Sequence, residues 1–462
     1  MKRTSIYLFT VLLFMFCGSG QPIAATHLAA SCERADVVDR IDAASPGDTI
    51  CVPGGSATWD TGVQITKSLR FIGQGRDALT ITAGATIGNG PLLNVALESS
   101  EWAEISGFTF DVANCASVGI ILNNVTSGTA LWNMRFHHCR IKNAPYRGIM
   151  THGKMFGLID YCDFVDNEYD FKCYGNSTAN DWTEYPGLAN IGTINYVYIE
   201  NCTSSGMDTK LVSSGESARW VYRHNTADIT GGGSAFNVHG DTSNFGVVAA
   251  EMYHNTIYTT EDPVVGGGGT SDIAGGTVIM FYNDMWGGTS GTRVGVSIEE
   301  ESGTGGAGQT CPANETYPES LSINNSYFWK NINTNDGNET VGGGELFTGT
   351  DYDPHDCILE NQDYFDDFAD GGAQGFEDPL NFTYGVIAAR PAEPCTENWC
   401  YWAEDVGDQA AGAQGVLYRC MGDSAWDEIY QPFTFPHPLS LDPDFNTDYV
   451  TATGDIVGVS ID

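Results

Sequence analysis

Residues 222–227 read YRHNTA and residues 252–257 read MYHNTI, so a short pattern returns after 30 positions. An apolar residue is followed by two variable residues, then Cys or Asn, then a variable residue and a second apolar residue. Further copies, several of them imperfect, begin at Ile105, Phe136, Ile159, Ile199, Phe281 and Ile323. Their starts lie 23 to 42 residues apart, which suits coils of three short strands, some with an inserted loop.

Stacked coils place equivalent residues about 4.8 Å apart, the strand spacing of a sheet. Ile199, Tyr222 and Met252 are therefore expected in one column of the core. The fourth pattern position should form a ladder at a bend, made of Cys139, Cys162, Cys202, Asn225, Asn255 and Asp284. Stacked Cys pack as small apolar residues, and stacked Asn can hydrogen-bond to one another. The pattern predicts an all-β, right-handed parallel β-helix solenoid.

The flanking segments predict a cap, a cover and an export signal. Residues 1–30 combine Lys2 and Arg3 with an apolar run too short to cross a bilayer comfortably, which is typical of a signal peptide. Residues 31–350 are expected to form the β-helix, beginning with a short capping helix over 35–44. Residues 351–462 are richer in Asp, Pro and aromatics, and we expect a carboxy-terminal cover of the β-helix or a small β module.

Cysteine usage and charge narrow the environment and the partners. The 13 cysteines become 12 without Cys17, an even number that permits disulfides in an exported chain. Cys32/Cys51 and Cys395/Cys400 are the expected pairs. A formal net charge of −39 argues against nucleic acid and anionic membranes as partners. It also disfavours a polyanionic substrate, unless a local basic patch or bound cations reverse the field.

One lateral patch stands out, because basic residues are scarce elsewhere. Residues on either side of an inward apolar position face outward in a strand. Three successive coils then present Tyr196, Tyr198, Glu200, Arg219, Val221, Arg223, Ala249, Glu251 and Tyr253 on one surface, with Lys210 nearby. Tyrosine rings can stack on sugar rings, and Arg can bind a uronate carboxylate with two hydrogen bonds.

Such a patch suits β-elimination of a uronate polymer. A cation must neutralise the carboxylate before a base can remove the neighbouring C5 proton. Lys210, Arg219 and Arg223 are the candidate neutralising groups, and His239 or Tyr253 the candidate bases. Tyr196, Tyr198, Glu251 and Tyr253 are the candidate substrate-binding residues.

Each of these residues also has a structural interpretation. Glu200 and Arg223 can form an exposed salt bridge of little energetic consequence. His224 and His254 fall at the bend and suit turn positions, and His239 begins a His-Gly-Asp sequence typical of a turn.

Calcium is a candidate cofactor. Seven aspartates between residues 351 and 370 offer oxygen ligands, although their spacing matches no EF-hand loop and a solvated loop explains them as well: Asp351, Asp353, Asp356, Asp363, Asp366, Asp367 and Asp370.

Longer stretches resemble a known group. ADVVDRIDAASPGDTICVPGG at 35–55 and GVQITKSLRFIGQG at 62–75 resemble the cap and first coil of exported bacterial β-helix proteins of the pectate-lyase-like superfamily. QPFTFPHPL at 431–439 resembles the closing segment of such chains. The resemblance implies the fold and leaves the activity open, because this fold carries lyases, hydrolases, epimerases and inert adhesins. The Gly-His-Gly and Trp-x-Asp-His motifs of active branches are absent.

Two hypotheses follow. The chain is a secreted protein that binds an extracellular, uronate-containing polysaccharide and cleaves it as a polysaccharide lyase. Alternatively, it is a non-catalytic adhesin or structural protein of the cell surface or matrix that uses the same face for contact.

Overall fold

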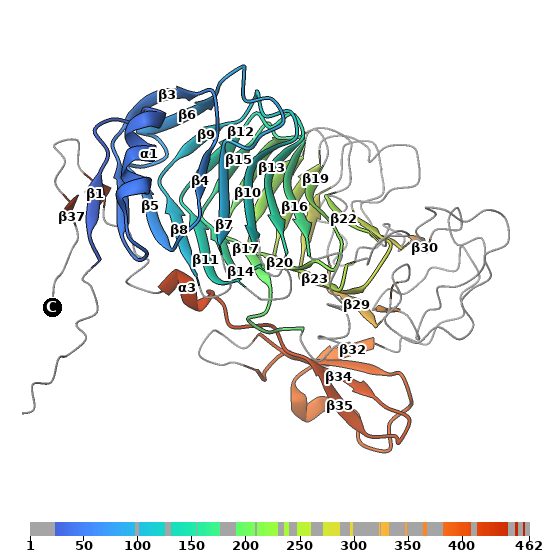
Figure 1. Cartoon of the computed structure of the whole chain (residues 1–462). Helices are drawn as coiled ribbons and strands as arrows, with labels where there is room; N and C mark the ends of the chain where they lie inside the picture. Colours follow the sequence, from blue (N-terminus) through green and yellow to red (C-terminus); the bar gives the residue numbers. More distant parts are fainter. Residues whose placement is uncertain are drawn as a thin grey trace, which may run out of the picture.

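Three long parallel sheets wind into a solenoid (Figure 1). The computed structural model describes residues 24–97, 101–124, 131–153, 155–175, 191–207, 210–229, 235–239, 247–259, 271–286, 296–298, 323, 325–331, 347–348, 364–366, 382–407, 414–441, 449–450 and 456–457. Successive strands pass from sheet A to sheet B to sheet C, and each strand pairs in parallel with its equivalents in the adjacent coils. The predicted parallel β-helix is confirmed.

Sheet A has twelve strands and carries the repeated sequence pattern. Its strands are β1 (Thr26–Leu28), β2 (Thr49–Val52), β5 (Leu69–Gly73), β8 (Ala103–Ser106), β11 (Leu131–His137), β14 (Met155–Asp160), β17 (Val197–Glu200), β20 (Arg219–Arg223), β23 (Ala249–Tyr253), β26 (Thr277–Phe281), β29 (Ser326–Trp329) and β31 (Tyr364–Asp366).

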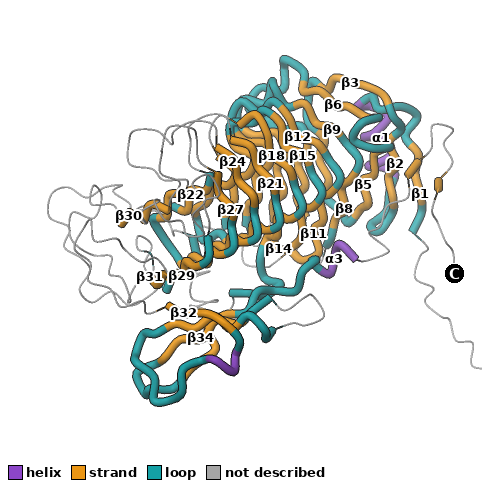
Figure 2. Tube along the Cα trace, turned by 180° about the vertical axis from the view of Figure 1, so that it is seen from behind, coloured by secondary structure: helices purple, strands orange, loops and turns teal. Residues whose placement is uncertain are grey.

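Sheet B has nine strands and faces the viewer in Figure 2. They are β3 (Gly55–Trp59), β6 (Leu79–Ala83), β9 (Thr109–Asp111), β12 (Arg140–Lys142), β15 (Asp163–Val165), β18 (Thr203–Met207), β21 (Thr226–Ile229), β24 (Thr256–Thr259) and β27 (Asp284–Trp286).

Sheet C has ten strands and faces the viewer in Figure 1. They are β4 (Val63–Ile65), β7 (Leu93–Leu97), β10 (Val118–Asn124), β13 (Arg147–His152), β16 (Tyr169–Tyr174), β19 (Lys210–Gly215), β22 (Phe236–Val238), β25 (Ser271–Ile273), β28 (Val296–Ile298) and β30 (Phe347–Thr348).

The predicted core column is confirmed by the strand register. Ile199 pairs with Tyr222, and Tyr222 pairs with Met252. All three side chains are fully buried. Because alternate residues point into the core, this register also fixes which residues of sheet A face outward.

The bend after sheet A carries the expected ladder, with two corrections. Its members are Cys139, Cys162, Cys202, Asn225, Asn255, Asn283 and Asn331. Asn283 takes the place expected for Asp284, because Met280 rather than Phe281 pairs with Met252 and the pattern is shifted there by one residue. The copy expected at Ile323 is misplaced, because Phe328 pairs with Met280 and brings Asn331 into the ladder. Each Asn side-chain oxygen accepts the backbone N–H of the preceding ladder residue, as Asn255 does from Asn225 at 3.0 Å.

The ends of the solenoid differ from the expected boundaries. Helix α1 (Arg34–Ala43) packs against β2, β3 and β4 through the buried Val37 and Ile41, as the expected cap would. β1 already pairs with β2 and lies inside residues 1–30, the range expected to be a signal. β31 continues sheet A beyond residue 350. Among the described helices, none is long and apolar enough to cross a membrane.

The carboxy-terminal part is a small sheet followed by a segment that runs back along sheet A. Its elements are β32 (Phe382–Gly385), the 3-10 helix η3 (Ile387–Ala389), β33 (Cys400–Ala403), β34 (Val416–Cys420), β35 (Trp426–Tyr430) and helix α3 (Pro438–Leu441). Two short strands, β36 (Tyr449–Val450) and β37 (Ile456–Val457), pair with each other. We call residues 430–441 the strap, and it lies beneath sheet A in Figure 1.

Both expected disulfide pairings are wrong. Cys395 bonds to Cys420, with the two Cα atoms 6.0 Å apart. Cys400 is a buried thiol whose side chain packs on the solenoid side of the small sheet, whereas Cys395 and Cys420 pack on its other side. Cys32 and Cys51 are buried thiols too.

Candidate functional site

The lateral patch predicted from the sequence exists as a geometric arrangement. Tyr198 pairs with Val221 and Val221 with Glu251, while Glu200 pairs with Arg223 and Arg223 with Tyr253. The residues therefore form two adjacent columns on the outer side of sheet A, in the expected register.

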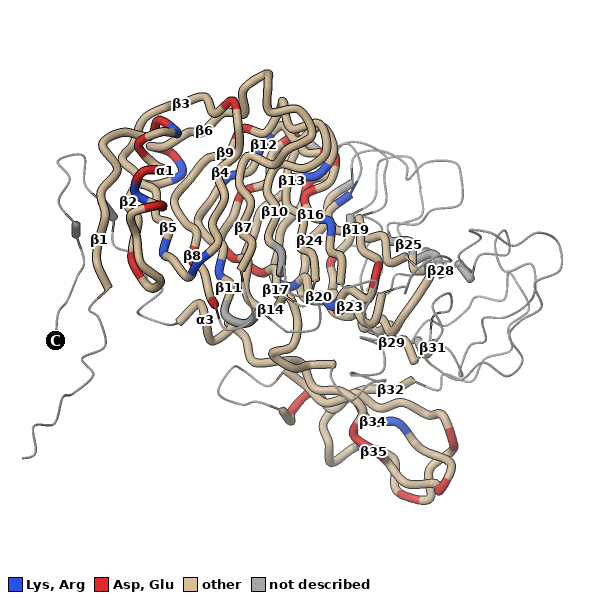
Figure 3. Tube along the Cα trace, viewed as in Figure 1, with Lys and Arg blue, Asp and Glu red and all other residues tan. Residues whose placement is uncertain are grey.

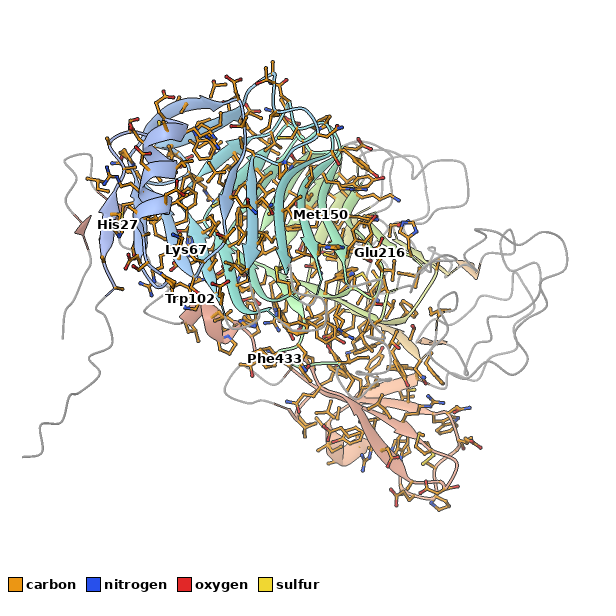
Figure 4. The ribbon with its side chains drawn as sticks, viewed as in Figure 1. His27, Lys67, Trp102, Met150, Glu216 and Phe433 are labelled. Atoms are coloured by element: carbon orange, nitrogen blue, oxygen red, sulfur yellow. A yellow bond between two sulfur atoms is a disulfide. The ribbon has the colours of Figure 1, made fainter. Side chains whose placement is uncertain are left out.

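The expected exposure of this patch is wrong. Tyr196, Tyr198, Glu200, Arg223, Glu251 and Tyr253 are each at most 1% exposed. The strap covers them, and Phe433 lies between the solenoid and the small sheet in Figure 4. A polymer outside the molecule cannot reach these side chains in this conformation.

Arg223 is bound by the strap and by neighbouring coils. Its guanidinium donates to Glu200 Oε2 at 2.7 Å and to the Tyr253 hydroxyl at 2.8 Å. It also donates to the carbonyls of Phe433 at 2.7 Å and Thr434 at 2.9 Å. Burial alone would lower the pKa of Arg223, but the adjacent Tyr253 and Glu200 outweigh it and raise that pKa. The Glu200–Arg223 salt bridge is thus buried, where the sequence suggested an exposed one.

Glu251 and Glu200 also bind the strap. They lie on β23 and β17, the strands on either side of β20. Glu251 accepts from the Tyr430 hydroxyl at 2.7 Å and from the backbone N–H of Gly192 at 2.8 Å. Burial raises the pKa of Glu251 to about 7, although both hydrogen bonds oppose this shift. Glu200 Oε1 accepts the backbone N–H of His437 at 2.9 Å. The columns of sheet A therefore form the docking surface of the strap.

The histidines at the bend hold structural positions, as the alternative interpretation predicted. His224 and His254 have φ of 54° and 55° and stack with ring centroids 5.0 Å apart. Phe435 of the strap stacks on His224 at 3.6 Å. Burial lowers the pKa of His224 to about 3 and that of His254 to about 4.

Two of the other three catalytic candidates lie on or beside sheet C, and the third, Arg219, begins β20 of sheet A. Lys210 begins β19, His239 follows β22, and both are half-buried. Arg219 lies at the corner between sheets C and A and is 6% exposed. It lines a small depression together with Tyr174, Gly175, Ser217 and Ala218.

Lys210 belongs to a cluster of cations and rings that the sequence pattern did not reveal. Strands β13, β16 and β19 are in register, so Arg147 pairs with Tyr169 and Tyr169 with Lys210. Figure 3 shows Lys and Arg gathered where these strands lie side by side. We call this surface the basic face of sheet C and define it by Tyr146, Arg147, Tyr169, Lys172, Tyr174 and Lys210. Met150, labelled in Figure 4, lies on the same face.

The cations of the basic face lie against aromatic rings. The Arg147 guanidinium is 4.1 Å from the ring centroid of Tyr146 and 5.8 Å from that of Tyr174. Lys172 Nζ lies 4.7 Å from the Tyr174 ring centroid, and Lys210 Nζ lies 6.0 Å from that of Tyr169. Among the described residues, neither Arg147 nor Lys172 forms an ion pair with a carboxylate.

Lys172 forms the floor of the basic face. It is 6% exposed, and its Nζ donates to Ser213 Oγ at 2.8 Å. Burial lowers the pKa of Lys172 to about 8, and the nearby Arg147 and Lys210 charges lower it further, although the Cys173 and Glu216 side chains oppose this shift. A lysine with such a pKa is partly uncharged near neutral pH and can accept a proton.

A metal centre is not evident in the described part of the chain, where His, Cys, Asp and Glu form no group of three suited to a metal. The aspartates proposed for calcium, between Asp351 and Asp370, have side chains outside the described residues.

Comparisons with known proteins give distant structural likenesses. A protein from Geobacillus virus E2 matches at 14% identity and a TM-score of 0.40, covering 64% of this chain and 53% of its own, so the match spans about half of the viral protein. An alginate lyase from Paenibacillus sp. str. FPU-7 matches at 11% and 0.30, covering 59% of this chain and 93% of the lyase. A pectin methylesterase solved with a hexasaccharide matches at 12% and 0.28, covering 67% and 89%.

No family model and no curated protein matches the chain. The fold is established by the strand pairing itself, and membership of the pectate-lyase-like superfamily stays a prediction.

Proposed function

We propose that the basic face of sheet C binds a uronate-containing extracellular polysaccharide and cleaves it by β-elimination. One observation carries the proposal. In a chain of net charge −39 with only 20 Lys and Arg, three cations and three tyrosine rings gather on three adjacent strands. Glu168 and Glu216 lie near Tyr169 and Lys172 and offset part of this charge. A local excess of cations is what a strongly acidic protein needs to hold a polyanion.

The chemistry assigns one role to each kind of side chain. Tyr146, Tyr169 and Tyr174 offer ring faces to sugars, and Arg147 and Lys210 bind carboxylates. Uncharged Lys172 removes the C5 proton, and the C5–H electrons form the C4–C5 double bond. The C4–O bond to the neighbouring sugar breaks, and its oxygen takes a proton from the Lys172 ammonium, which regenerates the uncharged amine. The products are an unsaturated uronate end and a new hydroxyl end.

The test uses the whole chain and a panel of polymers. Polyuronates, a sulfated glycan and a neutral glucan are compared by affinity electrophoresis and by ultraviolet absorbance of the C4–C5 double bond. We expect retardation by polyuronate at low salt, weakened by added salt, and formation of the double bond. Equal retention on neutral glucan would overturn the proposal.

Two variants locate the site. Lys172→Gln should lower turnover by about 10²–10⁴-fold, the usual contribution of a general base. Arg147→Gln should weaken binding about ten- to hundredfold, the effect of losing a charged hydrogen bond. Lys142→Gln on sheet B is the matched control, because Lys142 pairs with Asp111 on another face. If Lys142→Gln has the same effect as the two site variants, the site is misplaced.

The same experiment separates cleavage from binding. Retention of polyuronate without a new double bond would refute the lyase step. That outcome would favour the second hypothesis, a non-catalytic adhesin or structural protein of the surface or matrix.

A further inference from the structure

Gly215 is the last residue of β19. Neither of the usual constraints that require glycine, a left-handed φ or a lack of space for a Cβ, applies to it. Its φ is outside the left-handed region, and a Cβ placed on it would meet its nearest neighbour, Tyr174 Cε1, at an ordinary 3.6 Å. Among the glycines that lie inside the described strands, Gly215 alone combines an ordinary φ with ordinary space for a Cβ. Packing therefore does not exclude a small side chain here.

Glycines in the other strands show what a structural requirement looks like. A Cβ on Gly73 would lie 2.4 Å from a backbone oxygen, and one on Gly119 would lie 2.8 Å from Val112. Gly157 has φ of 152°, and Gly206 has φ of 71°. A strand glycine with neither constraint often marks a place where something approaches the backbone closely.

At Gly215 the approaching group is the ring of Tyr174. Tyr174 pairs with Gly215 on the adjacent strand, and Cε1 and Cδ1 of its ring are the atoms nearest to the added Cβ apart from His239 Cβ. Gly215 is buried and Tyr174 is half-buried, and the ring edge made by Cδ1 and Cε1 is the part of the ring nearest to the glycine. The ring can lie low against β19 because no side chain lifts it.

Tyr174 is also the residue that joins the parts of the basic face. Its ring is near the Arg147 and Lys172 charges and makes an edge contact with His152, the ring centroids being 6.5 Å apart. It lines the depression that contains Arg219. A sugar stacked on this ring would therefore have its carboxylate within reach of the cations.

We propose that Gly215 is a positioning residue of the polysaccharide site, which holds the Tyr174 ring flat as the stacking platform for the sugar at the cationic cluster. This inference rests on the function proposed above. It predicts that bulk at residue 215 weakens polymer binding through Tyr174 and through no other residue.

A purely structural role makes a different prediction. An aromatic ring that covers a strand glycine can stabilise the sheet, and then a change at 215 would alter stability alone. Under our proposal Gly215→Val weakens polymer binding, and the thermal midpoint is unchanged or raised because valine favours strands. Under a purely structural role the thermal midpoint changes and polymer binding does not. Polymer binding and stability are therefore measured side by side.

The experiment is a double-mutant cycle on the full chain with a defined polyuronate oligomer. Gly215→Val should raise KM about three- to tenfold with kcat unchanged, the loss expected for one aromatic stacking contact. Gly215→Ala should retain most of the affinity, because its Cβ fits. In a Tyr174→Ala background, Gly215→Val should have no further effect. Ser205→Val, which adds similar bulk to an exposed position of sheet B, is the control.

The outcomes distinguish this inference from the function on which it rests. If Lys172→Gln abolishes turnover but Gly215→Val binds and turns over as the unmodified chain does, the inference is wrong and the proposed function stands. Additive effects of Gly215→Val and Tyr174→Ala would also overturn it. If the unmodified chain neither binds nor cleaves any polyuronate, both fail together.

Discussion

Arg223 and Glu200 face each other across strands β20 and β17, with Nη2 and Oε2 2.7 Å apart and neither side chain exposed at all. The strap supplies the two remaining acceptors of Arg223, the carbonyls of Phe433 and Thr434, and its His437 N–H binds Glu200. A residue expected to meet a polysaccharide thus holds the chain's own carboxy-terminal segment.

Removing Arg223 should strongly destabilise the fold. Arg223→Met leaves Glu200 buried without its cation and two strap carbonyls without a donor, which costs about 3–5 kcal/mol. Arg140→Met, at a half-exposed pair with Asp77 and Asp163, should cost about 0–1 kcal/mol. Chemical denaturation measures both. If Arg223→Met lowers the free energy of unfolding as little as Arg140→Met does, the strap contributes little to stability.

The asparagine ladder should be more sensitive than the cysteine ladder at the same bend. The Asn255 amide nitrogen donates to the carbonyl of Tyr222 at 2.8 Å and to Asn283 Oδ1 at 2.9 Å. Asn255→Ala removes the donor to the Tyr222 carbonyl and the acceptor of the Asn225 backbone N–H, and each loss should cost about 1–3 kcal/mol. Cys202→Ala, which loses weak thiol contacts to the carbonyls of Ile159 at 3.8 Å and Glu200 at 3.4 Å, should cost less. A comparison of unfolding free energies decides this, and a greater loss for Cys202→Ala would contradict it.

Asp170 should make the protein less stable as pH rises. Burial raises its pKa to about 7, although the nearby Ser204 hydroxyl and the hydrogen bond from Asn167 Nδ2 at 3.0 Å oppose this shift. Between its ordinary pKa near 3.8 and about 7 the folded state holds the proton more tightly than the unfolded state. Stability from this group is therefore complete below the lower value and is lost as pH rises toward the upper one. The free energy of unfolding of Asp170→Asn should fall less over this range. An unchanged slope would refute the assignment.

The cleavage rate should rise with pH through about 8, where Lys172 loses its proton. The uncharged amine is the base, so activity follows the deprotonated fraction. Lys172→Arg keeps the charge but cannot deprotonate, and it should bind polymer while losing turnover at every pH. Initial rates between pH 6 and 10 on a fixed polyuronate test this. A flat profile would assign the base elsewhere.

The repeat made the fold and much of sheet A predictable. The column of Ile199, Tyr222 and Met252 follows from strand alternation and coil spacing, which are both local properties of the sequence. The register failed by one residue at Asp284, because Phe281 is apolar and fits the pattern as well as Met280 does. It failed again at Ile323, where Phe328 holds the column position.

The covering of the outward columns of sheet A by the strap was not predictable in the same way. Tyr430 reaches Glu251 across 179 residues, and His437 reaches Glu200 across 237. Such contacts have no period, and the aromatic residues of 431–439 gave no indication of which coils they bind. The basic face was missed because the pattern describes sheet A and its bend, whereas Arg147 and Lys172 lie on sheet C strands.

The path of the strap changes how the solenoid can come apart. Coils that touch only their neighbours can fray one at a time from an end. Here Tyr430 is bound at β23, Phe433 at β20, His437 at β17 and α3 at β14. One segment therefore contacts four consecutive coils. None of them can peel away alone, so this block should unfold as a single cooperative unit rather than by stepwise erosion.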